Sequence, residues 1–328
     1  MIFLVTISSS FCQQNGKETF YVSTWNVENL FDTVDDPLIN DQEFLPGTEK
    51  DWNESRFETK LLNLTKVINY MNDGCGPDII ALQEVENINV LKYLSYNFKD
   101  RDYIMAHRDS PDERGIDVCL LYDRNVFDIV EIIPIKVNLP SRSPTRDILH
   151  VTLIHKNKGT VLNIFVNHWP SRRGGVKTSE PNRIEAATTL KNYIDKLERD
   201  AYYIILGDFN DEPGNTSIED ILGAKDFSCS IPATENLLNL SYKKFKNEEG
   251  SYLFQGSWDM IDQMIISNNF LDGINLEYEC ESFSVIKPFF MVEKEGSRKN
   301  GPKPTYRGNN YIGGYSDHFP IGAKFYFN

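Results

Sequence analysis

The chain has 328 residues, of which 40% are hydrophobic and 25% charged, a composition typical of globular proteins. Its 34 basic and 48 acidic residues give a formal net charge of −14, which repels polyanions at long range. Bulk charge therefore does not favour nucleic acid as a partner, although a local basic groove or bound divalent cations reverse the sign where contact is made.

The N-terminal stretch "MIFLVTISSSFCQQNGKETF" passes from apolar residues to small residues and then to Gln and Asn. It resembles a secretory signal with its cleavage region near Ser10 to Cys12, although the usual basic start is missing. We expect residues 1–16 to be a signal-peptide remnant or a disordered N-terminus, and the alternative is a buried first strand. A signal predicts a periplasmic or extracellular protein; without one the protein is cytoplasmic.

The rest of the chain contains neither a low-complexity linker nor a repeat of fixed period, so we expect one domain over residues 17–328. No run of about 18 apolar residues follows the N-terminus, so stable membrane insertion is not expected. Four cysteines outside the N-terminal segment permit disulfides in an oxidising compartment, with the pairing left open. They are Cys75, Cys119, Cys229 and Cys280.

Apolar segments rich in β-branched and aromatic residues predict strands. In chain order they cover residues 19–27, 77–85, 117–123, 160–169, 201–209 and 258–267. Between them, residues 54–73 and 180–200 carry apolar positions every three or four residues, which predicts helices. Alternating strands and helices indicate an α/β protein. Several strands are continuous apolar runs, as expected for a sheet that is covered on both faces.

Acids, amides and histidines recur where these strands end. The set comprises Asn26, Glu28, Glu84, His168, Asp208 and Asn210, with Asp262 inside an apolar strand and Asp317 and His318 before the last one. Each residue alone is explained by a cap, a turn or a satisfied core histidine. Repeated burial of such groups costs free energy unless they satisfy one another or a cation, so the set predicts a site.

The chemistry that needs this set is attack of water on a phosphoester. Mg²⁺, or alternatively Mn²⁺, prefers oxygen ligands, which Glu84 and Glu28 provide together with Asp317. Zinc is disfavoured because the histidines are scattered and there is no Cys-x-x-Cys pair. Asp208 and Asn210 lie two residues apart and are expected to orient and deprotonate the water.

His318 is the expected proton donor to the phosphate oxygens, because a histidine can hold a proton near neutral pH. A buried acid such as Asp262 would fix its tautomer.

The segments "TWNVEN", "ALQEVEN", "NHWPSRRGG", "GDFNDEP", "WDMID" and "GYSDHFP" occur in this order. As a set they resemble the endonuclease/exonuclease/phosphatase superfamily over nearly the whole chain. The resemblance implies a four-layer αββα sandwich, in which two mostly antiparallel sheets are flanked by helices.

The resemblance also implies roles for single residues. It makes Glu84 the principal Mg²⁺ ligand, with Asn26, Glu28 and Asp317 nearby in the metal site. His168 falls at a position that contacts the phosphate. The remaining matches are Asp208 and Asn210 as the water-positioning pair and Asp262 as the acid paired with the catalytic His318.

Basic residues at the rim are candidates for substrate binding, because guanidinium groups suit phosphates. The first group contains Arg114, Arg146, Arg172 and Arg173. A second group lies just before "SDH": residues 287–307, which include Arg307, hold six basic and two acidic residues, a net charge of +4. The alternative for the second group is a solvated loop.

Three functions compete at this stage. The first is a secreted Mg²⁺-dependent nuclease acting on DNA. The second is a phosphatase or a phospholipase-type phosphodiesterase, for which Phe289, Phe290 and Met291 would either enter a membrane interface or pack beneath the loop, and packing is favoured. The third is a binding module on an inactive scaffold. We infer no obligate protein partner.

Overall fold

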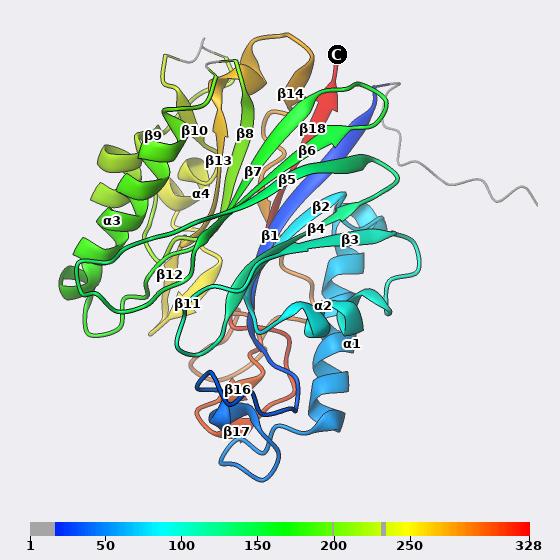
Figure 1. Ribbon diagram of the computed structural model, residues 1–328, viewed down its shortest axis with the longest axis vertical. Coiled ribbons are helices and arrows are strands. Elements are labelled where there is room, and N and C mark those ends of the chain that lie inside the picture. Colours follow the sequence, from blue (N-terminus) through cyan, green and yellow to red (C-terminus); the bar gives the residue numbers. More distant parts are fainter. Residues whose placement is uncertain (1–16, 199, 231–233) are drawn as a thin grey trace, which may run out of the picture.

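The computed structural model describes residues 17–198, 200–230 and 234–328, so the expected signal segment 1–16 lies outside the described residues. Two seven-stranded sheets pack face to face, with α3 outside one sheet and α1 and α2 outside the other (Figure 1). The predicted four-layer αββα sandwich is therefore confirmed.

The first sheet, here called sheet A, has the order β14-β18-β1-β2-β4-β3, and β15 also pairs with β18. Its strands are β1 (Thr19–Leu30), β2 (Ile79–Val85), β3 (Tyr103–His107), β4 (Asp117–Asp123), β14 (Leu276–Tyr278), β15 (Ser284–Val285) and β18 (Ile321–Phe327). The second, sheet B, has the order β5-β6-β7-β8-β13-β10-β9. Its strands are β5 (Phe127–Ile135), β6 (Ile148–His155), β7 (Val161–His168), β8 (Tyr202–Asp208), β9 (Ala224–Lys225), β10 (Leu237–Asn239) and β13 (Asp262–Ser267).

Over the described residues, two small hairpins, four helices and several short turns complete the fold. The hairpins are β11 (Tyr252–Phe254) with β12 (Ser257–Asp259) and β16 (Tyr306–Arg307) with β17 (Asn310–Tyr311). The helices are α1 (Glu54–Tyr70), α2 (Ile88–Ser95), α3 (Val176–Ile194) and α4 (Tyr242–Lys246). Single turns of 3₁₀ or π helix cover Gln42–Phe44, Asn72–Gly74, Ser217–Leu222 and Asn268–Leu271.

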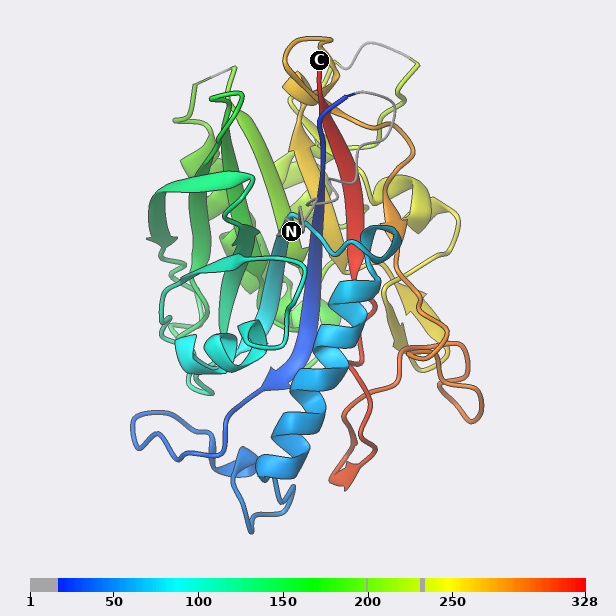
Figure 2. The same cartoon turned by 90° about the vertical axis from the view of Figure 1, so that its right-hand side faces the viewer.

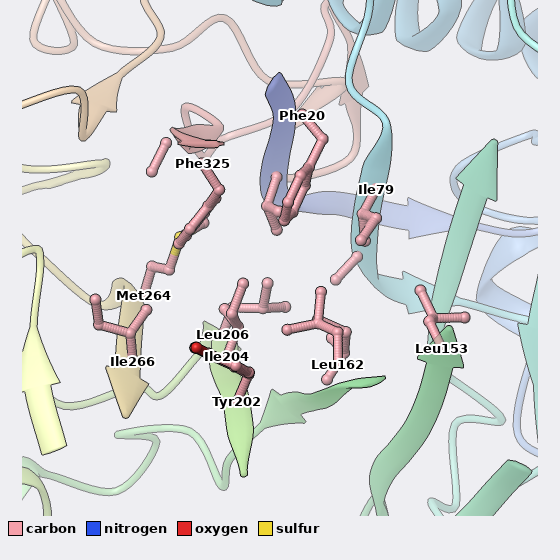
Figure 3. Close-up of a cluster of buried hydrophobic side chains, with 14 of the residues drawn as sticks. Phe20, Ile79, Leu153, Leu162, Tyr202, Ile204, Leu206, Met264, Ile266 and Phe325 are labelled. Carbon is pink, nitrogen blue, oxygen red and sulfur yellow. The ribbon is translucent and has the colours of Figure 1, made fainter. Parts of the chain in front are cut away.

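The space between the sheets is filled by apolar side chains from both. Phe20, Ile79 and Phe325 of sheet A face Leu162 and Leu206 of sheet B, and all five are at most 2% exposed (Figure 3). Burial of this many large apolar groups is the main favourable contribution to folding. The apolar runs thus face apolar neighbours on both sides, as their sequence predicts.

Helices cover the outer faces through the apolar positions that the periodicity predicts. The predicted positions Phe57, Leu61, Leu64, Ile68 and Met71 are all buried against sheet A, and α1 runs beside β1 and β18 (Figure 2). The helix begins after an N-cap at Asn53, whose side chain accepts a hydrogen bond from the Arg56 amide.

Several predicted boundaries were wrong. Helix α3 begins at Val176, before the predicted residue 180, and ends at Ile194. Side chains of Ser179 and Arg183 hydrogen-bond the Gly175 and Val176 carbonyls, which supports a first turn that Pro181 would otherwise weaken. The predicted strand 258–267 is split into β12 and β13, so Asp262 begins a strand rather than lying inside one.

The disulfide Cys229–Cys280 joins two loops that are 51 residues apart in sequence, which answers part of the open question of cysteine pairing. Cys119 lies fully buried in sheet A. Over the residues that the structure describes, no helix is long and apolar enough to cross a membrane.

Candidate active site

Strand direction brings the predicted residues to one end of the sandwich. β1 is parallel to β2, and β7 is parallel to β8, so Asn26, Glu84, His168 and Asp208 all lie near carboxyl ends of strands. Asp262 begins the antiparallel strand β13, directly opposite Asp208. The loop with Asp317 and His318 enters β18, which is antiparallel to β1. Sheet register therefore assembles a site from segments nearly 300 residues apart.

Backbone irregularities turn several of these side chains toward the site. Glu28, Glu84 and Asn210 have positive φ angles of 53°, 65° and 50°, which non-glycine residues rarely adopt. The sheet register shifts at Glu28 and again at Glu84. Strained conformations persist where the surrounding structure enforces them, often at functional sites. These three positions therefore support the functional interpretation.

Asn26 connects the two sheets. Its Nδ2 donates to Asp208 Oδ2 at 3.0 Å and to Glu84 Oε1 at 3.3 Å, and its Oδ1 accepts the Glu28 amide at 3.0 Å. The side chain is only 1% exposed, so these partners satisfy a group that would be costly to bury alone. Asn26 thereby fixes the relative positions of the carboxylates from both sheets.

The segment "LGDFND" places Asp208 at the end of β8. Gly207 has φ 132°, and a Cβ there would lie 2.0 Å from the Asn167 carbonyl oxygen, so only glycine allows this approach of β8 to β7. The Asn210 amide donates to Asp208 Oδ1 at 2.9 Å. Burial, together with the nearby Asp262, raises the pKa of Asp208 to about 7. A carboxyl group with this pKa can exchange a proton near neutral pH.

His318 and Asp262 form a buried pair. Nδ1 of His318 lies 2.7 Å from Asp262 Oδ2, and its Nε2 lies 4.0 Å from Asp208 Oδ2. Ser251 Oγ donates to the same Asp262 oxygen at 2.5 Å. Burial lowers the pKa of His318, but Asp262, Asp317 and Asp208 together raise it well above its ordinary value. The imidazole is therefore held as a cation, with Nε2 turned toward the centre of the site.

His168 has the opposite character. Its Nε2 lies 3.8 Å from Asp208 Oδ2 and 3.9 Å from Glu84 Oε1. Burial, followed by the charges of Arg146, Arg114 and His318, holds its pKa well below the ordinary value. The pKa values of the two histidines are thus shifted in opposite directions, because burial and cationic neighbours act on His168 while carboxylates outweigh burial at His318.

The donor set fits a hard divalent cation better than a soft one. Glu84 is half-buried, and the Asn29 amide donates to its Oε2 at 2.9 Å, which orients the carboxylate. Carboxylate oxygens from Glu84 and Asp208 converge here, held by the Asn26 Nδ2 group that donates to both. Asp208, Asp262 and His318 also lie close enough together to share an ion, but the bonded His318–Asp262 pair favours proton handling.

Glu28, predicted as a metal ligand, has other partners in the structure. Its Oε2 accepts the Thr305 amide at 2.6 Å and lies 4.0 Å from Lys60 Nζ. Asp317, from the same predicted set, is half-buried, and its carbonyl oxygen accepts Arg298 Nη2 at 3.4 Å.

The predicted rim arginines lie in different surroundings. Arg146 is buried, and its Nη1, Nη2 and Nε donate to Asp112, Trp169 and His168, so it fixes the β7 end instead of facing solvent. Arg172 donates to the Asn210 carbonyl and to Asp259.

The other three predicted arginines are more open. Arg307 is exposed and hydrogen-bonds Glu293. Arg114 is about half exposed, with Asp112 Oδ1 at 3.6 Å from its Nε. Arg173 is exposed. Arg114 and Arg173 are therefore the predicted arginines most accessible to a substrate.

Several neighbours of the site were not predicted as site residues. The Tyr252 ring packs on the His318 imidazole with centroids 4.6 Å apart, and the Arg298 guanidinium lies 5.9 Å from Tyr252. Lys60 is 1% exposed behind Glu28. Arg298 lies in the predicted basic segment, whereas Lys60 occupies an ordinary helix position and Tyr252 follows no motif.

Solved structures with this fold are similar over almost their whole length. One is an endonuclease/exonuclease/phosphatase family protein from Bacteroides thetaiotaomicron (18% identity, TM-score 0.59, covering 95% of this chain and 99% of that one). A mannosyl-6-phosphatase from the same organism shows 17% identity and a TM-score of 0.57, with 93% and 99% covered.

D. rerio TDP2, solved with a single-strand DNA product, shows 16% identity and a TM-score of 0.57, with 94% and 98% covered. No curated protein sequence matches the chain.

The sequence profile of the Endonuclease/Exonuclease/phosphatase family matches residues 21–326, which is almost the entire described domain. The cluster of carboxylates, amides and histidines at the strand ends is consistent with this match. The chain therefore belongs to the endonuclease/exonuclease/phosphatase family, whose members are divalent-metal-dependent phosphoester hydrolases.

Proposed function

We propose that this phosphoester hydrolase is an exported Mg²⁺-dependent nuclease that cleaves DNA. The observation that carries the proposal is the basic segment 287–307, which contacts the His318 side of the site through Arg298. Arg298 of this segment donates to the Asp317 carbonyl and lies beside Tyr252, which covers His318. A cationic segment at this place favours a substrate with phosphates on both sides of the scissile bond.

In the proposed reaction, Asp208 accepts a proton from the attacking water, and Asn210 helps to keep Asp208 in place. The water oxygen forms a new bond to phosphorus while the bond to the leaving oxygen breaks. The leaving oxygen takes up a proton from solvent, which balances the proton given to Asp208. His318, charged through Asp262, donates a hydrogen bond to the phosphate oxygens.

Glu84, with Asp208 and Asn26 nearby, would hold the divalent ion. When bound, such an ion neutralises negative charge on the phosphate and favours ionised carboxylates around it. Mg²⁺ is proposed over Mn²⁺ because the donors are oxygen atoms and Mg²⁺ commonly binds through one or two carboxylates.

A phosphatase acting on a small substrate is the second candidate. Arg146, Arg172 and Arg307 already pair with Asp112, Asp259 and Glu293. Fewer cations are then available to a long polyanion, and a short phosphoester needs fewer. A lipid substrate has weaker support, because Phe290 packs against Tyr70 and Tyr315 and Met291 is fully buried. The expected packing was wrong for Phe289, whose side chain is 77% exposed.

Export is supported by the disulfide Cys229–Cys280, because disulfides persist mainly in oxidising compartments. Mass spectrometry of the mature protein after expression in its full-length form would test this part. We expect a chain that starts just after the predicted cleavage region, Ser10 to Cys12, with a mass two hydrogens below that of the reduced form, whereas an intact N-terminus would contradict export by a cleaved signal.

The nuclease proposal is tested by comparing wild type with His318→Ala, in Mg²⁺ and in EDTA. The substrates are plasmid DNA, a single-stranded oligonucleotide, bis-p-nitrophenyl phosphate, mannose 6-phosphate, inositol phosphates and sphingomyelin. We expect cleavage of DNA that requires both Mg²⁺ and His318. Turnover of mannose 6-phosphate or inositol phosphate alone would replace the nuclease by the phosphatase, and turnover of sphingomyelin alone would favour the lipid enzyme.

A further inference from the structure

Helix α1 places a buried lysine directly behind the candidate metal site. Lys60 is 1% exposed, although lysine is almost never fully buried unless it is paired. Its Nζ donates to Thr305 Oγ1 at 2.5 Å and to the Tyr315 carbonyl at 2.7 Å, and it lies 4.0 Å from Glu28 Oε2. Three oxygen atoms thus surround one ammonium group.

The groups that hold Lys60 belong to the loop that leads to the catalytic histidine. Asn63, one turn along α1, donates to the Gly313 and Gly314 carbonyls at 3.3 and 2.8 Å. The hairpin β16–β17 of this loop lies beside the first half of α1 in both views (Figures 1 and 2). Because α1 and the loop are tied at several points, the ammonium cannot swing away without breaking them.

Glu28 is held from the same side. Besides Lys60, the Thr305 and Tyr306 amides donate to its two oxygens at 2.6 and 3.5 Å. The Thr305 hydroxyl, the Tyr315 carbonyl and the Glu28 carboxylate surround the Lys60 Nζ with acceptor oxygens, an arrangement that fits an ammonium group, which has three donors.

A divalent ion bound to Glu28 would therefore lie next to a fixed positive charge. Lys60 Nζ is only 4.0 Å from Glu28 Oε2, and two positive charges this close to one carboxylate repel strongly when water is excluded. The oxygens of Glu28 also already accept two backbone hydrogen bonds. Glu84 also accepts two hydrogen bonds, from the Asn26 side chain and the Asn29 backbone, but Lys60 lies within ion-pair distance of Glu28 and not of Glu84. The Glu84 carboxylate is thus open to a metal ion, whereas the Glu28 carboxylate already has the Lys60 ammonium beside it.

We propose that the Lys60 ammonium replaces a second divalent cation, so that the site binds one metal ion near Glu84, and Glu28 serves as the partner of Lys60. This inference rests on the proposed metal-dependent function. It makes Lys60 a positioning residue, because it acts through Glu28 and the 303–315 loop rather than on the substrate.

The test is a count of bound Mn²⁺ on the full chain by isothermal titration and by electron paramagnetic resonance of free Mn²⁺. We expect one ion in wild type and a loss of binding in Glu84→Gln. Glu28→Gln should still bind one ion with an affinity within about threefold of wild type, a change below 1 kcal/mol. Two ions in wild type, of which Glu28→Gln loses one, would overturn the proposal.

Lys60→Met removes the ammonium and should allow a second ion to bind, whereas Lys60→Arg keeps the charge and should bind one. A folded Lys60→Met protein that still binds one ion would overturn the role given to Lys60. If Lys60→Met does not fold, the comparison of Glu28→Gln with Glu84→Gln still decides. One bound ion without cleavage of DNA would reject the nuclease and leave the single-ion inference standing.

Discussion

The two sheets contribute unequal halves to the site. Sheet A and its loops supply Asn26, Glu28, Glu84, Asp317 and His318, and sheet B supplies His168, Asp208, Asn210 and Asp262. Each half has one buried cation from its covering helix. Lys60 of α1 lies 4.0 Å from Glu28, while Arg183 of α3 lies 2.7 Å from Asp211 and is fully buried.

The two cations differ in what surrounds them. Arg183 forms a close ion pair with Asp211, which also accepts a hydrogen bond from Ser217 Oγ at 2.6 Å, so the charge of Arg183 is compensated locally. Lys60 has mostly neutral acceptors and several carboxylates within electrostatic reach. We infer that the sheet B cation maintains the backbone behind "GDFND", whereas the sheet A cation shapes the charge of the site itself.

The largest expected effect comes from removing either of two catalytic side chains, Asp208 of sheet B or His318 of sheet A, which face each other across the site. Asp208→Ala and His318→Ala should each lower kcat by about 10³-fold or more, as expected when the general base or a charged donor to the phosphate oxygens is removed. Because Asp208 is buried with a pKa of about 7, its loss should not lower the melting temperature. Kinetics and thermal unfolding are compared with Asp128→Ala, on exposed β5, as the control. Near-normal turnover by Asp208→Ala would refute the assignment of the base.

The next effect concerns stability. Arg183→Met leaves Asp211 buried without its partner, which should cost about 3–5 kcal/mol in urea unfolding. The matched control is Lys156→Met, which breaks the exposed pair with Asp128 and should cost less than about 1 kcal/mol. Turnover per folded molecule should change little in either variant. If both variants lost the same free energy of unfolding, the buried pair would be no more important for stability than the exposed pair, and this prediction would be wrong.

A smaller effect separates the two histidines by pH. Asp262→Asn removes the carboxylate that raises the pKa of His318, so kcat should fall about 10²-fold and the alkaline limb of the pH–rate profile should move to lower pH. Protonated His318 also stabilises the folded wild type. This contribution to the free energy of unfolding is fully present below the unfolded pKa of about 6.5 and is lost as pH rises through the folded pKa. Because Asp262→Asn lowers the folded pKa, the variant should lose this stability at a lower pH.

Asp117→Asn is the control for this experiment, because Asp117 lies 2.9 Å from the His107 ring nitrogen in a similar buried pair. Its profile should keep the wild-type alkaline limb. An unchanged limb in Asp262→Asn would mean that His318 does not set it.

The smallest expected effect is at the rim. Arg173 is exposed on the loop after β7, so Arg173→Gln should weaken DNA binding only a few-fold and reduce the salt slope of binding by about one. Arg124→Gln, which breaks an exposed pair with Asp102 near the turn between β4 and β5, is the control and should leave the slope unchanged. A slope unchanged in Arg173→Gln would argue against a contact with the DNA backbone.

Sequence reasoning predicted the strand-end residues because each motif combines a buried strand with a polar terminus. The strands around Asn26, Glu84, His168 and Asp208 all occur where they were predicted. The arrangement of two sheets came from the family resemblance, since periodicity alone does not distinguish one covered sheet from two. The bonds among these residues depend on sheet register, which no local pattern specifies.

Other features could not be read from local patterns. A lysine in an amphipathic helix usually reaches solvent, so the burial of Lys60 depends on a loop 245 residues later in the chain. Arg146 was predicted at the rim from its charge, yet its guanidinium reaches inward to Asp112 and to carbonyls at the end of β7. Long side chains take their place from tertiary packing, which is decided far from their own segment.

The disulfide Cys229–Cys280 has a consequence for the lifetime of the enzyme. It joins residues 51 positions apart in sequence, and the closed loop contains Ser251, Tyr252 and Asp262. The ends of this loop therefore stay linked when the protein unfolds. Loop-closure entropy for this span corresponds to about 4 kcal/mol of stabilisation. In a reducing compartment the folded enzyme would therefore unfold at a lower temperature and be digested faster by proteases, while the turnover of the molecules that remain folded stays the same. The redox state of the compartment thus controls the lifetime of the enzyme.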